Sequence, residues 1–97
     1  MADTGDTRKP LTGTFRVAGP LQFGDIEDGN SHLYFYLDGE VAKSMYDSLT
    51  LEPVENECGG GLVKRAGALE CTRLMEDYRC EFSLEHETQK IGIASTC

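Results

Sequence analysis

Residues 32–49 read HLYFYLD followed by GEVAKSMYDSL, and the change of pattern between the two parts decides the fold class. Apolar and more polar side chains alternate up to position 37, which is the two-residue repeat of a β-strand. Two sets of three side chains therefore face opposite ways. The predicted core face carries Leu33, Phe35 and Leu37, and the other face carries His32, Tyr34 and Tyr36.

A helix is predicted over about residues 39–49, because the apolar residues there return at steps of three and four and form one stripe. The stripe consists of Val41, Ala42, Met45, Tyr46 and Leu49. Asp38 precedes it and is a residue type whose carboxylate accepts hydrogen bonds from first-turn amides. We therefore expect the Asp38 side chain to cap this helix.

Shorter alternating segments surround this unit. Strands are predicted at 14–17, 62–65, 68–74, 78–85 and 90–95, with a loop at 24–30 and an irregular connection at 50–61. Leu21 and Phe23 extend the first alternation briefly, and the three glycines at 59–61 predict a flexible joint. The order predicts a small α+β domain with an antiparallel β-sheet of five to six strands and one α-helix on one face. Residues 11–97 are assigned to this single domain, and residues 1–10 to a flexible N-terminal lead-in.

Four cysteines, at positions 58, 71, 80 and 97, predict a domain stapled by disulfides. An even number in a chain of this length favours disulfides, and no pair has the C-x-x-C spacing typical of zinc or redox sites. If residues 74–77 form a hairpin loop that pairs Arg73 with Tyr78, then Cys71 lies directly opposite Cys80. That register predicts the pairs Cys71–Cys80 and Cys58–Cys97. Free buried thiols and a metal site are the alternatives.

The negative charge is concentrated in one part of the chain. The formal net charge is −8, and residues 17–63 hold nine acidic residues against one basic residue, Lys43. Such a surface repels phosphate backbones and anionic lipids, which argues against nucleic acid as a partner. It would attract a basic protein, although a solvated acidic surface that only aids solubility has the same composition. No apolar run is long enough to span a membrane.

A partner-binding surface is predicted within this acidic part. Tyrosine buries a large area at low entropic cost, so an open face of His32, Tyr34 and Tyr36 would suit contact with a protein. We expect that face to be open, because one helix cannot readily cover both faces of a sheet. The neighbouring loop adds the carboxylates of Asp25, Glu27 and Asp28.

No catalytic, metal or cofactor motif is found. Counted from Asp25, the glycine and glutamate of a calcium-binding loop would fall at the wrong positions. The glycines at 59–61 lack the lysine and hydroxyl residue of a phosphate-binding loop. His86 lies between two glutamates in a predicted turn, without a nucleophile in a recognisable motif.

These observations predict a small exported, non-enzymatic protein-binding module, such as an inhibitor, an immunity-type protein or a secreted factor. Disulfides point to the periplasm or the extracellular space, although residues 1–10 lack the apolar core of a signal peptide. One alternative is a small enzyme or ligand-binding domain with a carboxylate site at residues 25–28 or 85–87. Another is an accessory subunit of a larger envelope assembly.

Overall fold

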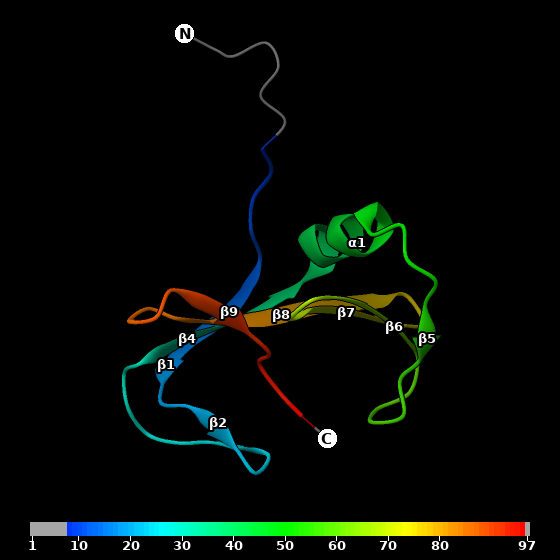
Figure 1. Cartoon of the computed structure of the whole chain (residues 1–97). Coiled ribbons are helices and arrows are strands. Elements are labelled where there is room, and N and C mark those ends of the chain that lie inside the picture. Colours follow the sequence, from blue (N-terminus) through cyan, green and yellow to red (C-terminus); the bar gives the residue numbers. More distant parts are fainter. Residues whose placement is uncertain (1–7, 97) are drawn as a thin grey trace, which may run out of the picture.

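The computed structural model describes residues 8–96 of the chain as one helix and nine strands (Figure 1). The strands and the helix are β1 (Gly13–Ala18), β2 (Leu21–Gln22), β3 (Asp25–Ile26), β4 (His32–Asp38), α1 (Gly39–Ser48), β5 (Val54–Glu55), β6 (Leu62–Ala66), β7 (Leu69–Leu74), β8 (Asp77–Glu85) and β9 (Lys90–Gly92). The predicted α+β fold with one helix on an antiparallel sheet is confirmed.

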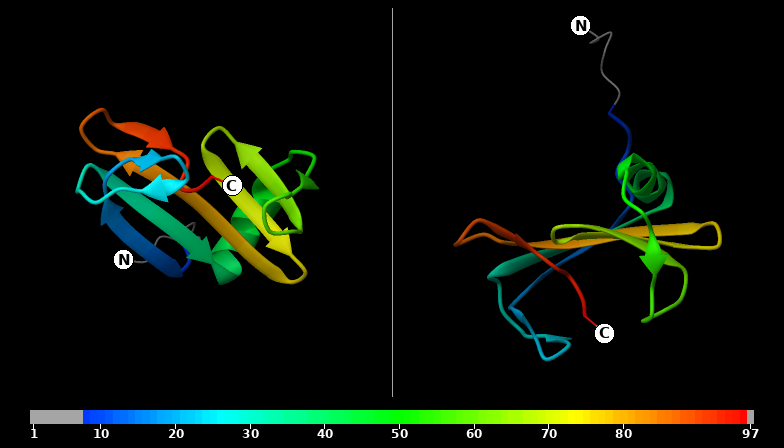
Figure 2. Two further views of the ribbon diagram at one scale, coloured as in Figure 1. Left: turned by 90° about the horizontal axis from the view of Figure 1, so that it is seen from below. Right: turned by 45° about the vertical axis from the view of Figure 1, so that its right-hand side comes forward.

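Seven strands form one antiparallel sheet in the order β1-β4-β8-β7-β6-β5, with β9 also paired to β8 (Figure 2). The long strand β8 lies at the centre and pairs with β4 through residues 79–85. On its other side it pairs first with β7 and then with β9. The sheet has seven strands where five to six were expected, since the two-residue β5 lies within the predicted connection at 50–61.

The predicted register of the β7–β8 hairpin is confirmed. Arg73 pairs with Tyr78, and Cys71 pairs with Cys80 and is joined to it by a disulfide. The turn is shorter than the predicted four-residue loop, because Leu74 and Asp77 still pair and only two residues connect them. Two-residue turns match the twist of antiparallel strands.

Helix α1 packs its predicted apolar stripe on one side of the sheet, which we call the helix face. Ala42 and Tyr46 are buried there against Leu37 and both cysteines of the hairpin. The remaining stripe residues, Val41, Met45 and Leu49, are partly buried around them. Because this cluster joins the helix to three neighbouring strands, it forms the larger of the two hydrophobic cores.

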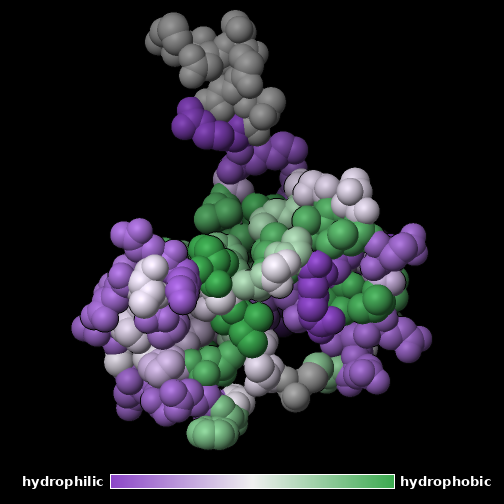
Figure 3. Space-filling model, viewed as in Figure 1, coloured by the Kyte–Doolittle hydropathy of each residue, from purple (hydrophilic) through white to green (hydrophobic). Residues whose placement is uncertain are grey.

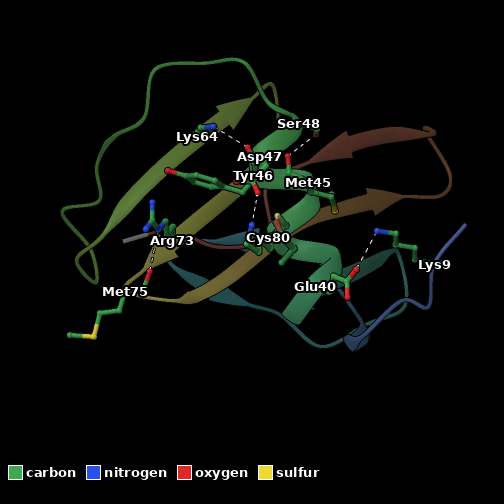
Figure 4. A network of polar contacts seen from close by, with 12 residues as sticks. Lys9, Glu40, Met45, Tyr46, Asp47, Ser48, Lys64, Arg73, Met75 and Cys80 are labelled. Atoms are coloured by element: carbon green, nitrogen blue, oxygen red, sulfur yellow. Dashed lines mark hydrogen bonds and ion pairs between the residues drawn. The ribbon is translucent and has the colours of Figure 1, made fainter. Parts of the chain in front are cut away.

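The ends of α1 are held differently from the prediction. Asp38 occupies the N-cap position, but its carboxylate makes no capping hydrogen bond. Its backbone instead pairs with Thr12, whose hydroxyl donates to the Asp38 carbonyl at 2.7 Å. At the other end, the Lys64 ammonium from β6 donates to the carbonyls of Tyr46 at 3.0 Å and Leu49 at 2.8 Å (Figure 4). Lys64 thus supplies the positive charge that the last helical turn lacks.

The opposite side of the sheet is covered by the β2–β3 hairpin and the segment after β9, and we call it the hairpin face (Figures 1 and 2). A second core forms there from Ala18, Tyr34 and Ala94, with Ile26 packed against it. Residues 24–30 were predicted to be a loop, but they include the short strand β3. Phe23, expected to continue a strand, lies instead in the turn of this hairpin with a φ of 53°.

The glycine run at 59–61, which was predicted to be a flexible joint, lies in contact with β7. Gly61 has a φ of 82°, and a Cβ there would lie 2.3 Å from the Arg73 carbonyl oxygen. The Asn56 amide donates to the Gly61 carbonyl at 2.9 Å. Glycine at 61 is therefore required by close contact with β7.

Candidate functional site

The helix face is covered over only part of its area. Helix α1 lies over β8, β7 and the end of β4, whereas the half formed by β1, β4, β9 and the end of β8 has no helix above it (Figure 1). Strand alternation and register place seven apolar side chains on that uncovered half. This set, which we call the open face, consists of Phe15, Val17, Leu33, Phe35, Phe82, Leu84 and Ile91.

The open face is accessible to a large degree. Phe15 is 72% exposed, Ile91 58% and Val17 49%, while the other four side chains are partly buried. Phe35 and Phe82 stack across the strands with their ring centroids 5.0 Å apart. Contiguous exposed apolar patches of this kind mark interaction surfaces in folded proteins.

A second feature lies at the end of the sheet where the β3–β4 and β8–β9 loops meet. The His86 amide donates to the Ser31 carbonyl at 3.3 Å, and His86 Nε2 lies 2.6 Å from the Asn30 carbonyl oxygen. These contacts bring the segment that follows Asp25, Glu27 and Asp28 against the loop that carries Glu85 and Glu87, on a side of the molecule that is largely hydrophilic in Figure 3. We call this group the acidic end; its members are Asp25, Glu27, Asp28, Glu85 and Glu87.

Phe23 lies in the turn of the β2–β3 hairpin, two residues before Asp25. Its side chain is fully exposed, although an apolar ring in water is unfavourable. Phe23 also borders a hollow of about 370 Å³ whose lining includes Leu21, His32, Tyr34 and Ile93. A projecting aromatic next to a shallow hollow is typical of residues that anchor protein–protein contacts.

The predicted face of His32, Tyr34 and Tyr36 is largely closed, contrary to expectation. Tyr34 is completely buried and its hydroxyl donates to the Gly19 carbonyl at 2.6 Å. His32 stacks on Tyr34 and its Nε2 lies 3.7 Å from a Glu85 carboxylate oxygen. The expectation failed because the β2–β3 hairpin, rather than a second helix, covers this face.

Burial also affects the acid–base properties of the two tyrosines. The pKa of Tyr34 is raised above its ordinary value by burial, with Tyr36 nearby adding to the effect. Burial is also the main cause of the raised pKa of Tyr36, and the Glu81 carboxylate contributes. Both phenols therefore stay neutral at physiological pH, and they act as packing and hydrogen-bonding groups.

A groove of about 570 Å³ crosses the hairpin face between the β5–β6 loop and the C-terminal segment. Its lining includes an ion pair between Arg65 and Glu70 at 2.8 Å, and Glu81, which accepts a hydrogen bond from the Ser95 hydroxyl. These internal contacts satisfy polar groups that a ligand would otherwise bind. The groove is therefore a weaker candidate site than the acidic end.

The cysteines are placed as predicted as far as the structure describes them. Cys71 and Cys80 form a buried disulfide, and none of the cysteines in residues 8–96 is a free thiol. Cys97 lies outside the described residues, so the pair Cys58–Cys97 stays a prediction.

Within the described part of the chain, no cluster of histidine, cysteine or acidic side chains has the arrangement of a metal site. None of the helices in that part has the length and apolar character needed to cross a membrane.

Two features of the surface were missed by reasoning from the sequence. Phe23 was taken as part of a strand, although the adjacent Gly24-Asp25 is a typical turn sequence. The open face was missed because Leu33 and Phe35 were assigned to a closed core. The length of the helix could have revealed it, because a ten-residue helix spans about 15 Å and cannot cover a sheet of this width.

No family model, curated protein or solved structure matches the chain.

Proposed function

We propose that the protein is a small exported, non-enzymatic protein-binding module whose acidic end engages a basic surface of another protein. The observation that carries this proposal is the contact between the segment after Asp25, Glu27 and Asp28 and the loop that carries Glu85 and Glu87. The fully exposed ring of Phe23 precedes the first of these carboxylates by two residues. The carboxylates would accelerate encounter with a basic partner, and the aromatic ring would bury apolar area once contact is made. An inhibitor, an immunity-type protein or a secreted factor would each use such a surface.

Export is part of the same proposal. Disulfides persist in oxidising compartments, and the Cys71–Cys80 bond is buried at the centre of the larger core. A location in the periplasm or outside the cell would keep this bond intact. Labelling of thiols on protein taken directly from its native source would test this, because four alkylated cysteines before reduction would contradict export.

The binding proposal can be tested with a basic amphipathic peptide of lysine and leucine as probe. The charge-neutralising variant is D25N/E27Q/D28N. Its matched control is E52Q/E55Q/E57Q, which removes the same charge from exposed glutamates elsewhere on the chain. Association rates would be measured on the full chain by surface plasmon resonance at low and high salt.

If the acidic end is the binding surface, D25N/E27Q/D28N slows association by about tenfold at low salt, and the control slows it by much less. Phe23→Ala then speeds dissociation without changing the association rate, since an apolar anchor acts after encounter. Equal losses in the two charge variants would mean that net charge alone attracts the peptide, and the proposed site would be wrong.

A further inference from the structure

The open face differs from the rest of the surface in carrying no charge. On β1, β4, β8 and β9, every position that points to the helix side is apolar, aromatic, cysteine or glycine. This occurs in a chain in which 27% of residues are charged and the net charge is −8. An uncharged apolar surface is favourable to bury, and it offers nothing to a partner that is recognised by its positive charge.

We propose that the open face is covered by the open face of a second copy of this chain. A two-fold axis brings the same patch of both copies together, so the patch must be compatible with itself. The open face meets that condition, because pairing it brings no like charges into contact. The acidic end does not meet it, since pairing two acidic ends would place carboxylates against carboxylates.

No helix of the described residues lies above the open face (Figure 1). Phe15 is 72% exposed there and Ile91 58%. Covering these side chains would remove a contiguous apolar surface from water, which is favourable.

The shape of the helix face leaves room for a second sheet. Helix α1 stands above one half of the face, and residues 8–12 rise beside it from the start of β1 (Figure 2). A packed helix is about 10 Å across, and two stacked sheets lie about 10 Å apart. A second sheet would therefore fit on the part of the open half that lies away from the helix and residues 8–12, with the two helices flanking a stacked pair of sheets.

The size of the open face limits the strength of this contact. Four strands at a spacing of about 4.8 Å make it roughly 19 Å wide. Its seven side chains are fewer than the roughly 20 to 30 residues that each partner contributes to a standard interface. We therefore expect a reversible dimer with a dissociation constant in the micromolar range, about 1 to 100 μM.

Salt acts on this dimer in the opposite direction from the proposed basic partner. Each copy carries a net charge of −8, so the two copies repel one another, and screening by salt reduces this repulsion. Dimerisation therefore strengthens as salt rises, whereas binding of a basic peptide to the acidic end weakens. The two proposals concern different surfaces and can fail independently.

Sedimentation velocity of the full chain tests the inference across protein concentrations from about 1 to 500 μM, which bracket the expected dissociation constant. The variants F15E and F15K alter the most exposed side chain of the open face. M75E is the matched control, because Met75 is 84% exposed in the β7–β8 turn, away from that face. Circular dichroism confirms that each variant is folded.

The expected result is a monomer–dimer equilibrium that strengthens severalfold between about 0.05 and 0.5 M salt and is lost in both Phe15 variants but retained in M75E. The opposite charges in F15E and F15K separate loss of apolar contact from a change in net repulsion. The inference is overturned by a monomer at every concentration, by a dimer that persists in F15E and F15K, or by a dimer that weakens as salt rises. Peptide binding at the acidic end should be unchanged in both Phe15 variants.

Discussion

The covered and open halves of the helix face belong to the same sheet and carry the same kind of side chain, yet they differ in environment. Leu37 and Leu33 lie four residues apart on β4 and point to the same side. Leu37 is 7% exposed beneath α1, whereas Leu33 lies between Val17 and Leu84 with no helix above it. The comparison shows that alternation specifies which face is apolar, while the length of the helix decides how much of that face the chain can cover by itself.

We expect the largest loss of stability from a substitution in the covered half of the helix face. Leu37→Ala leaves a cavity under Tyr46 and Ala42, so we expect a loss of about 3 kcal/mol in the free energy of unfolding. Leu33→Ala should cost about 1 kcal/mol in dilute protein, because its neighbours are already partly hydrated. Urea unfolding at low protein concentration measures both values. Equal losses would show that the open half is as well packed as the covered half.

The disulfide should have the next largest effect. Replacing both cysteines, C71A/C80A, removes a cross-link that closes a short loop, with a sequence separation of 9. The chain-entropy model gives a loss of about 2.5 kcal/mol in the free energy of unfolding for such a loop. Differential scanning calorimetry measures it against the intact protein. An unchanged transition temperature would mean that hydrophobic packing alone holds α1 on β7 and β8.

A substitution of Lys64 tests whether its hydrogen bonds to the C-terminal carbonyls of α1 stabilise the helix on the sheet. Lys64→Met keeps the length of the side chain but loses two hydrogen bonds to the last helical carbonyls and the contact with the Tyr46 ring. We expect a loss of about 1.5 kcal/mol in the free energy of unfolding. Lys43→Met is the control, because Lys43 pairs with a carboxylate, that of Asp47, and also lies over an aromatic ring, that of Tyr78, but its hydrogen bond goes to Asp47 rather than to a helical carbonyl. A similar result for the two variants would contradict the capping role.

The smallest expected effect on stability concerns Tyr34, which lies on the hairpin face, on the opposite side of the sheet from the open face. The pKa of Tyr34 is raised above its ordinary value of 10.0 in the folded protein. At a pH between 10.0 and the pKa of the folded state, the Tyr34 hydroxyl is therefore more often protonated in the folded chain than in the unfolded chain. Stability therefore falls as the pH rises above 10, and it is unaffected by this group below that pH. Tyr34→Phe should flatten the alkaline decline while lowering stability slightly at neutral pH, since the hydrogen bond to Gly19 is lost. Thermal melts from pH 8 to 11 follow the effect, and an unchanged alkaline slope would assign the decline to other groups.

The parts of the fold that were predictable are those set by local pattern. Alternation located β4 and β8, the apolar stripe located α1, and the register of one hairpin identified the Cys71–Cys80 bond. The cover of the hairpin face was not predictable, because the β2–β3 hairpin has only two residues in each strand and no clear periodicity. For the same reason the burial of Tyr34 was missed.

The candidate site was predicted only in part. Asp25, Glu27 and Asp28 were identified from composition, but the contact of the segment after them with the loop that carries Glu85 and Glu87 depends on His86 and residues more than fifty positions away. Such a contact leaves no local signal in one sequence. Phe23 was visible as an apolar residue in a turn, but its full exposure depends on where the hairpin projects.

The central position of β8 has a consequence for how the molecule folds and opens. Its partner β4 lies more than forty residues earlier in the chain, whereas β7 and β9 are immediate neighbours in sequence. Local pairing of β7 with β8 can therefore form quickly, while the pairing that joins the two parts of the sheet requires closure of a long loop and is slow. In the folded protein, the amide protons of β8 that face β4 should exchange with solvent only when the whole molecule unfolds, and those of β1 and β5 at the sheet edges should exchange through local fraying.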